Sequence, residues 1–367
     1  MSEQVRFVGY PSAHIYALSR TTPDTPPEDL EELKQLLWGD ELSVIGKSTD
    51  DQFLRVKVRK VEGWIRARDT QKNRLLEVVF VDIGQGDGAL IVTPENRTMI
   101  IDAGQGDNMY RFLKWRFDLT KPFVFDAAII SHADLDHYGG FEFLLDDPNV
   151  SFNTIYCNGL MERDNKSAPL GKRASVQGKS YVTELMGSMD ALRNFFATSA
   201  HLGKKYPTML SNAHSKAKFT DFRRLDHTDR YLPGHQAGDA LEIRVLGPCV
   251  EDVNGSPALR WFGNPGKTKN GHSVVMKFVF GNVSIFMGGD LNIESSRLLL
   301  ETHTGLPGNP KSAEGEAELV AAARPVLGCD VAKACHHGSA DTLLPFMQAI
   351  NPVATVISRE PLIKSQI

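Results

Sequence analysis

The chain contains few cysteines for its length. The four, Cys157, Cys249, Cys329 and Cys335, are scattered through 367 residues and form no C-x-x-C pair. This spacing favours neither a structural zinc site nor a disulfide framework, so we expect a reducing, cytoplasmic environment.

Long apolar runs are also missing. No stretch approaches the roughly 18 apolar residues that a membrane-spanning helix needs, and the N-terminus, M-S-E-Q-V-R-F, lacks the basic and apolar regions of a secretion signal. We therefore expect no membrane association. A net charge of -4 argues against a generally basic nucleic-acid binder, but it is compatible with a local basic groove.

The length and composition indicate a globular chain with one large and one small domain. The small domain is expected at residues 1–72, where the β-rich runs 41–45, 53–58 and 62–65 are separated by Gly and Asp. Leucines at helical spacing within residues 22–38 predict an inserted loop and short helix, and the polar stretch 69–74 predicts a linker.

One stretch of the larger domain, residues 73–367, concentrates potential metal ligands. Residues 129–140 read I-I-S-H-A-D-L-D-H-Y-G-G, so His132, Asp134, Asp136 and His137 directly follow an apolar run typical of a buried strand. In an extended segment the first three would share one side and His137 would face the other, which lets one loop serve two adjacent metal ions. The alternative is a solvated polar loop, because short motifs also arise by chance.

These residues and three other segments resemble known families. The spacing H-x-[HD]-x-D-H resembles the first metal motif of the metallo-β-lactamase superfamily, with Asp134 in place of the usual second histidine. V-D-I-G-Q-G-D-G at 81–88 and C-H-H-G-S at 335–339 resemble the hydrolase domain of ComEC-type competence proteins, over residues 75–358. W-G-D-E-L-S-V-I, L-R-V-K-V and E-G-W-I in the small domain resemble a bacterial SH3-like barrel. The fold class implied is α/β, a metallo-β-lactamase αββα sandwich preceded by a small all-β SH3-like barrel.

The resemblance also implies a set of metal ligands. They divide between two metal ions: His132, Asp134 and His272 for the first, Asp136, His137 and His336 for the second, with Asp290 as the bridge at the end of a predicted hairpin. His337 competes with His336 for one ligand position and otherwise holds a substrate phosphate or protonates a leaving group.

Roles beyond metal binding follow in the same way. Asp136 and His337 are the expected catalytic residues, and Lys333 and Ser339 are expected to contact substrate. Asp82 and Asp87 flank a glycine turn; we expect them to orient ligand histidines through their ring N–H groups.

The metals are expected to be two divalent ions. Asp134 adds oxygen and negative charge to the first site, which makes Mn²⁺ competitive with Zn²⁺. The predicted function is a phosphodiesterase, specifically a nuclease acting on DNA through a metal-bridged hydroxide. The alternatives are a small-molecule hydrolase, such as a cyclic-nucleotide or phosphocholine-type phosphodiesterase or a lactonase, and a non-catalytic interaction module. The SH3-like module is either a spacer or a docking site for a protein partner.

Residues 161–240 are predicted to be an insert of different composition, with 13 Lys and Arg against 8 Asp and Glu. Seven aromatic residues are interleaved with them, a mixture suited to phosphate contacts and base stacking: Tyr181, Phe195, Phe196, Tyr206, Phe219, Phe222 and Tyr231. The alternative is a helical cap with these aromatics in its core. ComEC-type domains continue beyond the strand that corresponds to 354–358, so we expect either a truncated C-terminus with further domains beyond it or the loss of that motif.

Overall fold

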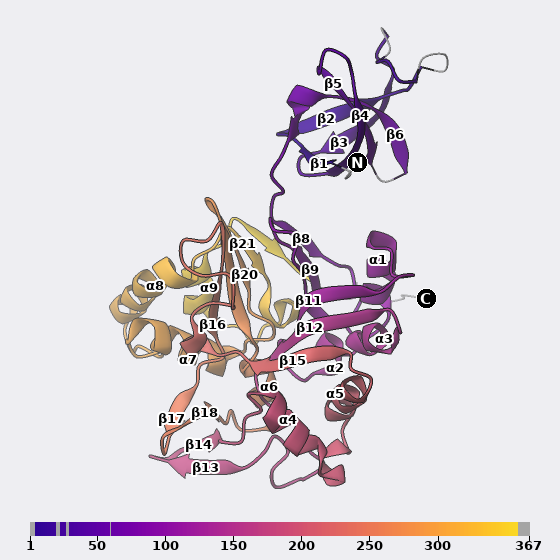
Figure 1. Ribbon diagram of the computed structural model, residues 1–367. Coiled ribbons are helices and arrows are strands. Elements are labelled where there is room, and N and C mark those ends of the chain that lie inside the picture. The colour runs from indigo at the N-terminus through magenta and orange to yellow at the C-terminus, as the bar shows by residue number, and fades with distance from the viewer. Residues whose placement is uncertain (1–3, 20–22, 27–28, 59, 359–367) are drawn as a thin grey trace, which may run out of the picture. The chain divides into compact units, whose positions relative to one another are not determined.

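The computed structural model describes residues 4–19, 23–26, 29–58 and 60–358 (Figure 1). By their contacts, the described residues divide into two compact units. One comprises residues 1–77 with 92–97, and the other comprises residues 78–91 with 98–367. The two units are described separately.

The N-terminal unit is an all-β region of seven strands. They are β1 (Gln4–Val8), β2 (Ser12–Tyr16), β3 (Glu32–Leu37), β4 (Glu41–Lys47), β5 (Phe53–Val58), β6 (Val61–Arg66) and β7 (Thr70–Gln71). Hydrogen bonds join them in the order β3-β2-β6-β5-β4-β1-β7 around a core of alternating apolar residues that includes Ile15, Leu42 and Val56. The assignment to SH3-like barrels stays a prediction.

One local prediction for this unit is wrong, and another holds only in part. The expected helix within 22–38 is strand β3, which pairs with β2; of its leucines Leu36 is buried, whereas Leu33 and Leu37 are 46% and 65% exposed. Strand pairing therefore outweighed the helical spacing of the leucines. Residues 22, 27 and 28 of that segment lie outside the described residues. The expected linker begins with β7, which pairs with β1.

The second unit contains a six-stranded sheet built around parallel strands. Its order is β15-β12-β11-β10-β9-β8, from β8 (Glu77–Phe80), β9 (Gly88–Val92), β10 (Thr98–Ala103), β11 (Phe123–Ile129), β12 (Val150–Cys157) and β15 (Phe219–Arg224). Strands β10, β11, β12 and β15 run parallel. Parallel strands are buried on both faces, which explains continuous apolar runs such as A-A-I-I at the end of β11.

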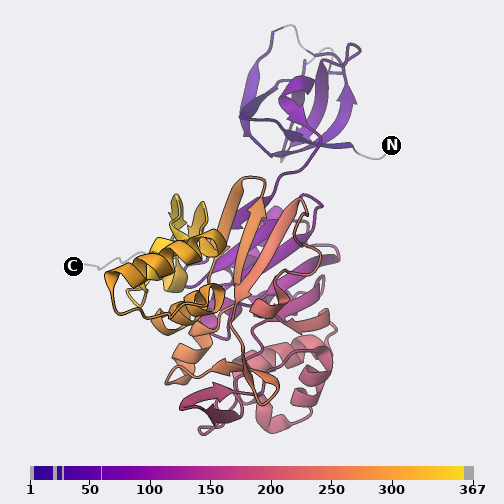
Figure 2. The same cartoon turned by 90° about the vertical axis from the view of Figure 1, so that its left-hand side faces the viewer.

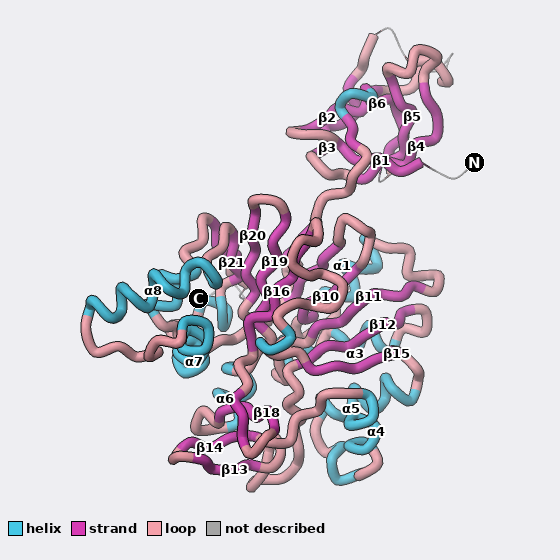
Figure 3. Tube along the Cα trace, turned by 60° about the vertical axis from the view of Figure 1, so that its left-hand side comes forward, coloured by secondary structure: helices cyan, strands magenta, loops and turns pink. Residues whose placement is uncertain are grey.

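A five-stranded sheet forms the other half of the unit. Its order is β16-β19-β20-β21-β22, from β16 (Leu241–Gly247), β19 (Val275–Phe280), β20 (Val283–Met287), β21 (Val331–Lys333) and β22 (Ala354–Val356). The predicted hairpin is β19 and β20, joined at Gly281-Asn282. Helices α7 (Ile293–Thr304), α8 (Ala313–Leu327) and α9 (Leu344–Ile350) cover its outer face, as Figures 2 and 3 show.

Helices also cover the outer face of the six-stranded sheet. They include α1 (Asn108–Arg116), α3 (Phe141–Asp146) and α5 (Lys205–Ser215), beside β11, β12 and β15 in Figure 1. Phe141 of α3 lies edge-on to Phe152 of β12, with ring centroids 6.0 Å apart. The two sheets are therefore enclosed between two helical layers, the arrangement expected for an αββα sandwich.

The predicted insert is only partly an insert. Its last strand, β15, belongs to the six-stranded sheet, and β13 (Arg173–Val176) and β14 (Lys179–Val182) join β18 (Ser256–Arg260) and β17 (Glu251–Val253) in a small sheet. Five of the seven aromatics expected to stack on bases are buried: Tyr181, Phe195, Tyr206, Phe219 and Phe222. The burial of these five agrees with the alternative interpretation, in which the aromatics form a core rather than a surface for bases. The reason is that the segment contributes strand β15 to the six-stranded sheet.

No helix among residues 4–19, 23–26, 29–58 and 60–358 has both the length and the apolar character needed to cross a bilayer.

Candidate metal centre

The candidate site is assembled at the carboxyl ends of strands from both sheets. The loop after β8 ends at Asp87, β10 carries Asp102, and the motif that begins with His132 follows β11. From the other sheet, Asp290 follows β20 and the His336-His337 pair follows β21. Parallel strands bring such loops to one edge, so segments far apart in sequence meet there.

The carboxylate of Asp290 lies between the histidines. Its Oδ1 is 3.2 Å from Nε2 of His137, and its Oδ2 is 3.6 Å from Nε2 of His337 and 3.9 Å from Nε2 of His132. Nε2 of His337 is also 3.5 Å from Oδ2 of Asp136. Ligands at about 2.0–2.2 Å from one ion are separated from each other by roughly 3–3.6 Å, so most of these spacings suit a shared metal.

Unpaired buried atoms support the same interpretation. Nε2 of His132, His137 and His337 and Oδ1 of Asp290 are all buried without a hydrogen-bond partner. Buried polar atoms normally have partners, and a ligand is one reason for an exception. Three overlapping groups offer ligand atoms within 4.8 Å of one another: His132, His137 and Asp290; Asp136, His137 and His337; and Asp87, Asp290 and His337. The donor set therefore fits divalent metal.

Ring orientation at this cluster is set by neighbours that the sequence analysis did not assign. Asp102 Oδ2 lies 2.8 Å from Nδ1 of His137, and Asp102 also accepts from the backbone N–H and hydroxyl of Ser131 at 2.7 and 2.6 Å. The Ser131 and Ser273 hydroxyls lie 3.0 and 3.2 Å from Nδ1 of His132. These contacts leave both Nε2 atoms facing the cluster. The signal for Asp102 was an acid at the end of an apolar strand, directly before Ala-Gly.

Two predicted ligands behave differently from the rest. Asp134 has Oδ2 at 3.7 Å from Nε2 of His132, while its Oδ1 is paired with the ammonium of Lys269. His272 is not brought to the cluster: its ring stacks on Phe262, and Nε2 donates a 2.7 Å hydrogen bond to the carbonyl of Arg260. Burial lowers the pKa of His272 to about 4, so its imidazole is neutral at pH 7.

His336 and His337 occupy adjacent positions with unusual backbone geometry. Both have left-handed φ angles, 50° and 54°, which non-glycine residues adopt rarely. Nε2 of His336 is 4.0 Å from Oδ2 of Asp290 and that side chain is 29% exposed, whereas His337 is nearer to Asp290 and is 12% exposed. Of the two, His337 is therefore the one whose Nε2 lies closer to the carboxylate of Asp290.

The other predicted residues surround this cluster. Nδ1 of His337 is 3.1 Å from Oδ1 of Asp87, and Lys333 pairs with the same oxygen at 2.6 Å. Lys333 is only 5% exposed, so its ammonium is occupied by Asp87 rather than directed at solvent, where a substrate would approach. Asp82 is exposed and accepts from the backbone N–H of Gly84, so it shapes the turn and contacts no histidine in the described structure. Ser339 lies two residues after His337, and its hydroxyl accepts a hydrogen bond from the backbone N–H of Asp341.

Charge within the cluster is strongly coupled. Burial opposes a charge on His137, but Asp290 and Asp102 raise its pKa well above the usual range. Burial likewise opposes a charge on His337, but the nearby carboxylates of Asp136, Asp87 and Asp290 raise its pKa to about 9. Burial favours the neutral form of Asp290, yet the neighbouring histidines hold its pKa well below the usual range. The carboxylates therefore create a strongly negative site that attracts cations.

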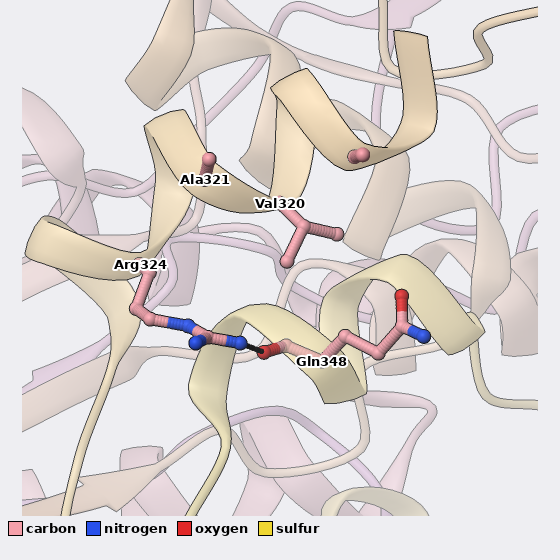
Figure 4. A pocket seen from close by; sticks show the side chains of 5 residues that line it. Val320, Ala321, Arg324 and Gln348 are labelled. Carbon is pink, nitrogen blue, oxygen red and sulfur yellow. Dashed lines mark hydrogen bonds between the residues drawn. The ribbon is translucent and has the colours of Figure 1, made fainter. Parts of the chain in front are cut away.

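An open hollow elsewhere on the unit has no such chemistry. It lies between α8 and α9 and is lined by Ala317, Val320, Ala321, Arg324 and Gln348, with Arg324 donating to the carbonyl of Gln348 (Figure 4). None of its lining residues is a carboxylate or a histidine.

Comparison with known proteins is consistent with this fold. Residues 81–154 match the family model described as "Metallo-beta-lactamase superfamily". A search of curated proteins found no match.

Several solved structures are similar at low identity. Tm1679, a metal-dependent hydrolase of the β-lactamase superfamily, is 13% identical over 78% of this chain and 96% of its own, with a TM-score of 0.36. MEM-A1, a subclass B3 metallo-β-lactamase from a soil metagenome library, is 14% identical over 78% and 89%, with a TM-score of 0.33. The short form of human tRNase Z is 12% identical over 77% and 97%, with a TM-score of 0.33.

The finer resemblance to ComEC-type domains stays a prediction. The predicted fold class is confirmed by the mixed α/β architecture and by the metallo-β-lactamase family model that matches residues 81–154: an all-β region is followed by two sheets between helical layers.

Proposed function

We propose that this protein is a dinuclear metal-dependent phosphodiesterase that acts as a nuclease on DNA. The observation that carries the proposal is the position of Asp290. Its Oδ1 lies near Nε2 of His137, and its Oδ2 lies near Nε2 of both His132 and His337. A carboxylate so placed suits a bridge between two ions, with His132 and Asp134 toward the first ion and Asp136, His137 and His337 toward the second.

The ions, Zn²⁺ or Mn²⁺, would supply an activated water and stabilise charge on the phosphoryl oxygens. The chain's own residues prepare the site. Asp102 keeps the proton of neutral His137 on Nδ1, which leaves Nε2 free to bind. The side-chain amide of Gln85 donates to Oδ2 of Asp136 at 3.0 Å and restrains that carboxylate. Burial of His132, His137 and Asp290 excludes bulk water and strengthens each electrostatic contact.

DNA as substrate is supported by the excess of positive charge in residues 161–240. Since most of the aromatics there are buried, contact with DNA would depend on phosphate charges rather than stacking. Such binding weakens steeply with salt.

A small-molecule phosphodiester or lactone is the second candidate. It is favoured by the ion pairs of the same segment, where seven of the 13 basic residues bind nearby carboxylates: Arg163, Lys179, Arg193, Lys204, Lys216, Arg223 and Arg224. Basic residues already paired with carboxylates contribute less to the binding of an extended polyanion such as DNA. This favours a small substrate that contacts only the metal centre.

The test is cleavage of single-stranded DNA, double-stranded DNA and RNA by the full chain in Mn²⁺, Mg²⁺ or Zn²⁺. The control is the double variant Asp136→Ala/His137→Ala. We expect metal-dependent cutting of DNA that is absent in the variant and falls with increasing salt. Turnover of bis(p-nitrophenyl) phosphate or a lactone without cutting of any polymer would instead establish the second candidate. No turnover of any substrate by metal-loaded protein would contradict both.

A further inference from the structure

Lys269 makes contacts with the candidate metal centre that no predicted role explains. It lies near the end of α6 (Pro265–Gly271), and its side chain is 12% exposed. Its ammonium is paired with Oδ1 of Asp134, lies 2.8 Å from Oε1 of Glu162 and is 3.2 Å from the carbonyl of Ala133. An ammonium has three N–H donors. All three have acceptors here, so no donor remains for a substrate.

The two oxygens of Asp134 are thereby given different partners. Oδ1 is held by Lys269, whereas Oδ2 faces Nε2 of His132 at 3.7 Å. Asn270 is the next residue of α6, and its amide nitrogen lies 2.7 Å from Oδ2 in the orientation that satisfies both polar atoms of the amide. The end of α6 therefore restrains the carboxylate through two consecutive residues.

We propose that Lys269 is a positioning residue that fixes Asp134 as a one-oxygen ligand of the first metal ion, with Oδ2 presented toward His132. A histidine at position 134 would need no such partner, because a neutral imidazole presents one nitrogen and adds no charge. The carboxylate has two equivalent oxygens and free rotation about its terminal bond, and the pairing with Lys269 removes that freedom. Glu162, in the loop after β12, in turn holds Lys269.

This inference rests on the proposed two-metal site, but its test involves no substrate. Metal-stripped full chain is titrated with Mn²⁺ by calorimetry, and bound metal is counted after gel filtration. The variants are Lys269→Met, Lys269→Arg and Lys267→Met. Lys267 is the matched control because it lies on the same helix and pairs with Glu294 at 2.8 Å, away from the cluster.

The wild-type chain should bind two ions. In Lys269→Met one binding event should weaken about tenfold or more, the usual effect of losing a partner that orients a ligand, while the other event is unchanged. Lys269→Arg should recover most of the loss, and Lys267→Met should match the wild type. Unchanged or tighter binding by Lys269→Met would overturn the proposal, because the ammonium would then only repel the ion. One ion per wild-type chain would overturn it as well, since Lys269 would then stand in place of the first ion.

If Lys269→Met fails to fold, Glu162→Gln decides. This variant keeps the pair between Lys269 and Asp134 but removes the charge that holds the ammonium from the other side. It should weaken the same binding event by about threefold to tenfold, toward the low end for such partners; an unchanged affinity overturns the proposal. The metal titrations need no substrate, so they can be interpreted even if the protein cuts no nucleic acid. A failure of the proposed nuclease function can therefore be distinguished from a failure of the proposed role of Lys269.

Discussion

The carboxylate of Asp102 lies 2.8 Å from Nδ1 of His137, and both side chains are almost completely buried. The strand β10 carries the acid, and the short helix α2 (Leu135–Tyr138) that follows β11 carries the histidine, so the pairing of these two strands places the ring beside the acid. His137 has one nitrogen held by this contact and the other directed at Asp290. This pair determines which nitrogen of His137 is available to a metal.

Asp102→Asn should therefore lower metal affinity by about 10- to 100-fold without unfolding the chain. The amide keeps the shape and tolerates the left-handed φ of 53° at this position, but it removes the charge beside the ring. Calorimetric titration with Mn²⁺ measures the loss, and thermal melting checks the fold. A variant with wild-type affinity would show that Asp102 has a structural role only.

His337→Asn should release one metal ion per chain, whereas His336→Asn should reduce affinity much less. Both positions have left-handed backbone, which asparagine accepts, so the two variants differ mainly in the imidazole removed. His337 reaches both Asp136 and Asp290, while His336 lies 4.0 Å from Asp290 alone. Metal counting by mass spectrometry after dialysis is the measurement. The reverse order would support the sequence-based assignment of His336.

Gly86→Ala should destabilise the chain by at least about 2 kcal/mol, from backbone strain and steric overlap together. Gly86 has a φ of 106°, and a Cβ there would lie 1.6 Å from the backbone oxygen of Asp136. Gly106→Ala is the control, because a Cβ at that position meets nothing within 4 Å. Urea unfolding of both variants gives the difference. Equal stability of the two variants would show that Gly86 does not pack closely against the backbone of Asp136.

His272→Phe should cost about 1–3 kcal/mol at pH 7, because the buried carbonyl of Arg260 loses its donor. The pKa of His272 in the folded chain is about 4 against an ordinary value of 6.5. Its neutral form thus adds stability that is complete above pH 6.5 and is lost as the pH falls toward 4. The shift corresponds to about 3 kcal/mol, so the gap between wild type and variant should shrink or reverse by pH 4.

Urea unfolding at pH 7, 6, 5 and 4 in the presence of a chelator measures that gap. The chelator removes any contribution from metal, which separates a core histidine from a ligand. A constant gap across this range would contradict the buried neutral state. A larger gap with Mn²⁺ than with chelator would instead favour the ligand role that the sequence analysis assigned to His272.

Much of the candidate site could be anticipated because its proposed ligands lie shortly after the ends of strands. His132, Asp136 and His137 come within seven residues of Ile130, where an apolar run ends, and Asp290 comes three residues after Met287, so the pattern is visible in the sequence. The short helix expected within residues 22–38 was wrong because leucine spacing is a weak local signal and the pairing of β3 with β2 outweighed it. The aromatics of residues 161–240 could be assigned to a surface or a core only after β15 was seen in the main sheet.

The sequence alone determined the ligand types, their order along the chain and the class of fold, since periodicity and motif spacing are local properties. Only the tertiary structure decided which atoms face one another. It turned His272 toward Arg260, placed His337 nearer than His336 to Asp290, and brought Asp102 to His137 and Lys269 to Asp134. The physical reason is that side-chain direction depends on how distant segments pack, and no local pattern records that packing.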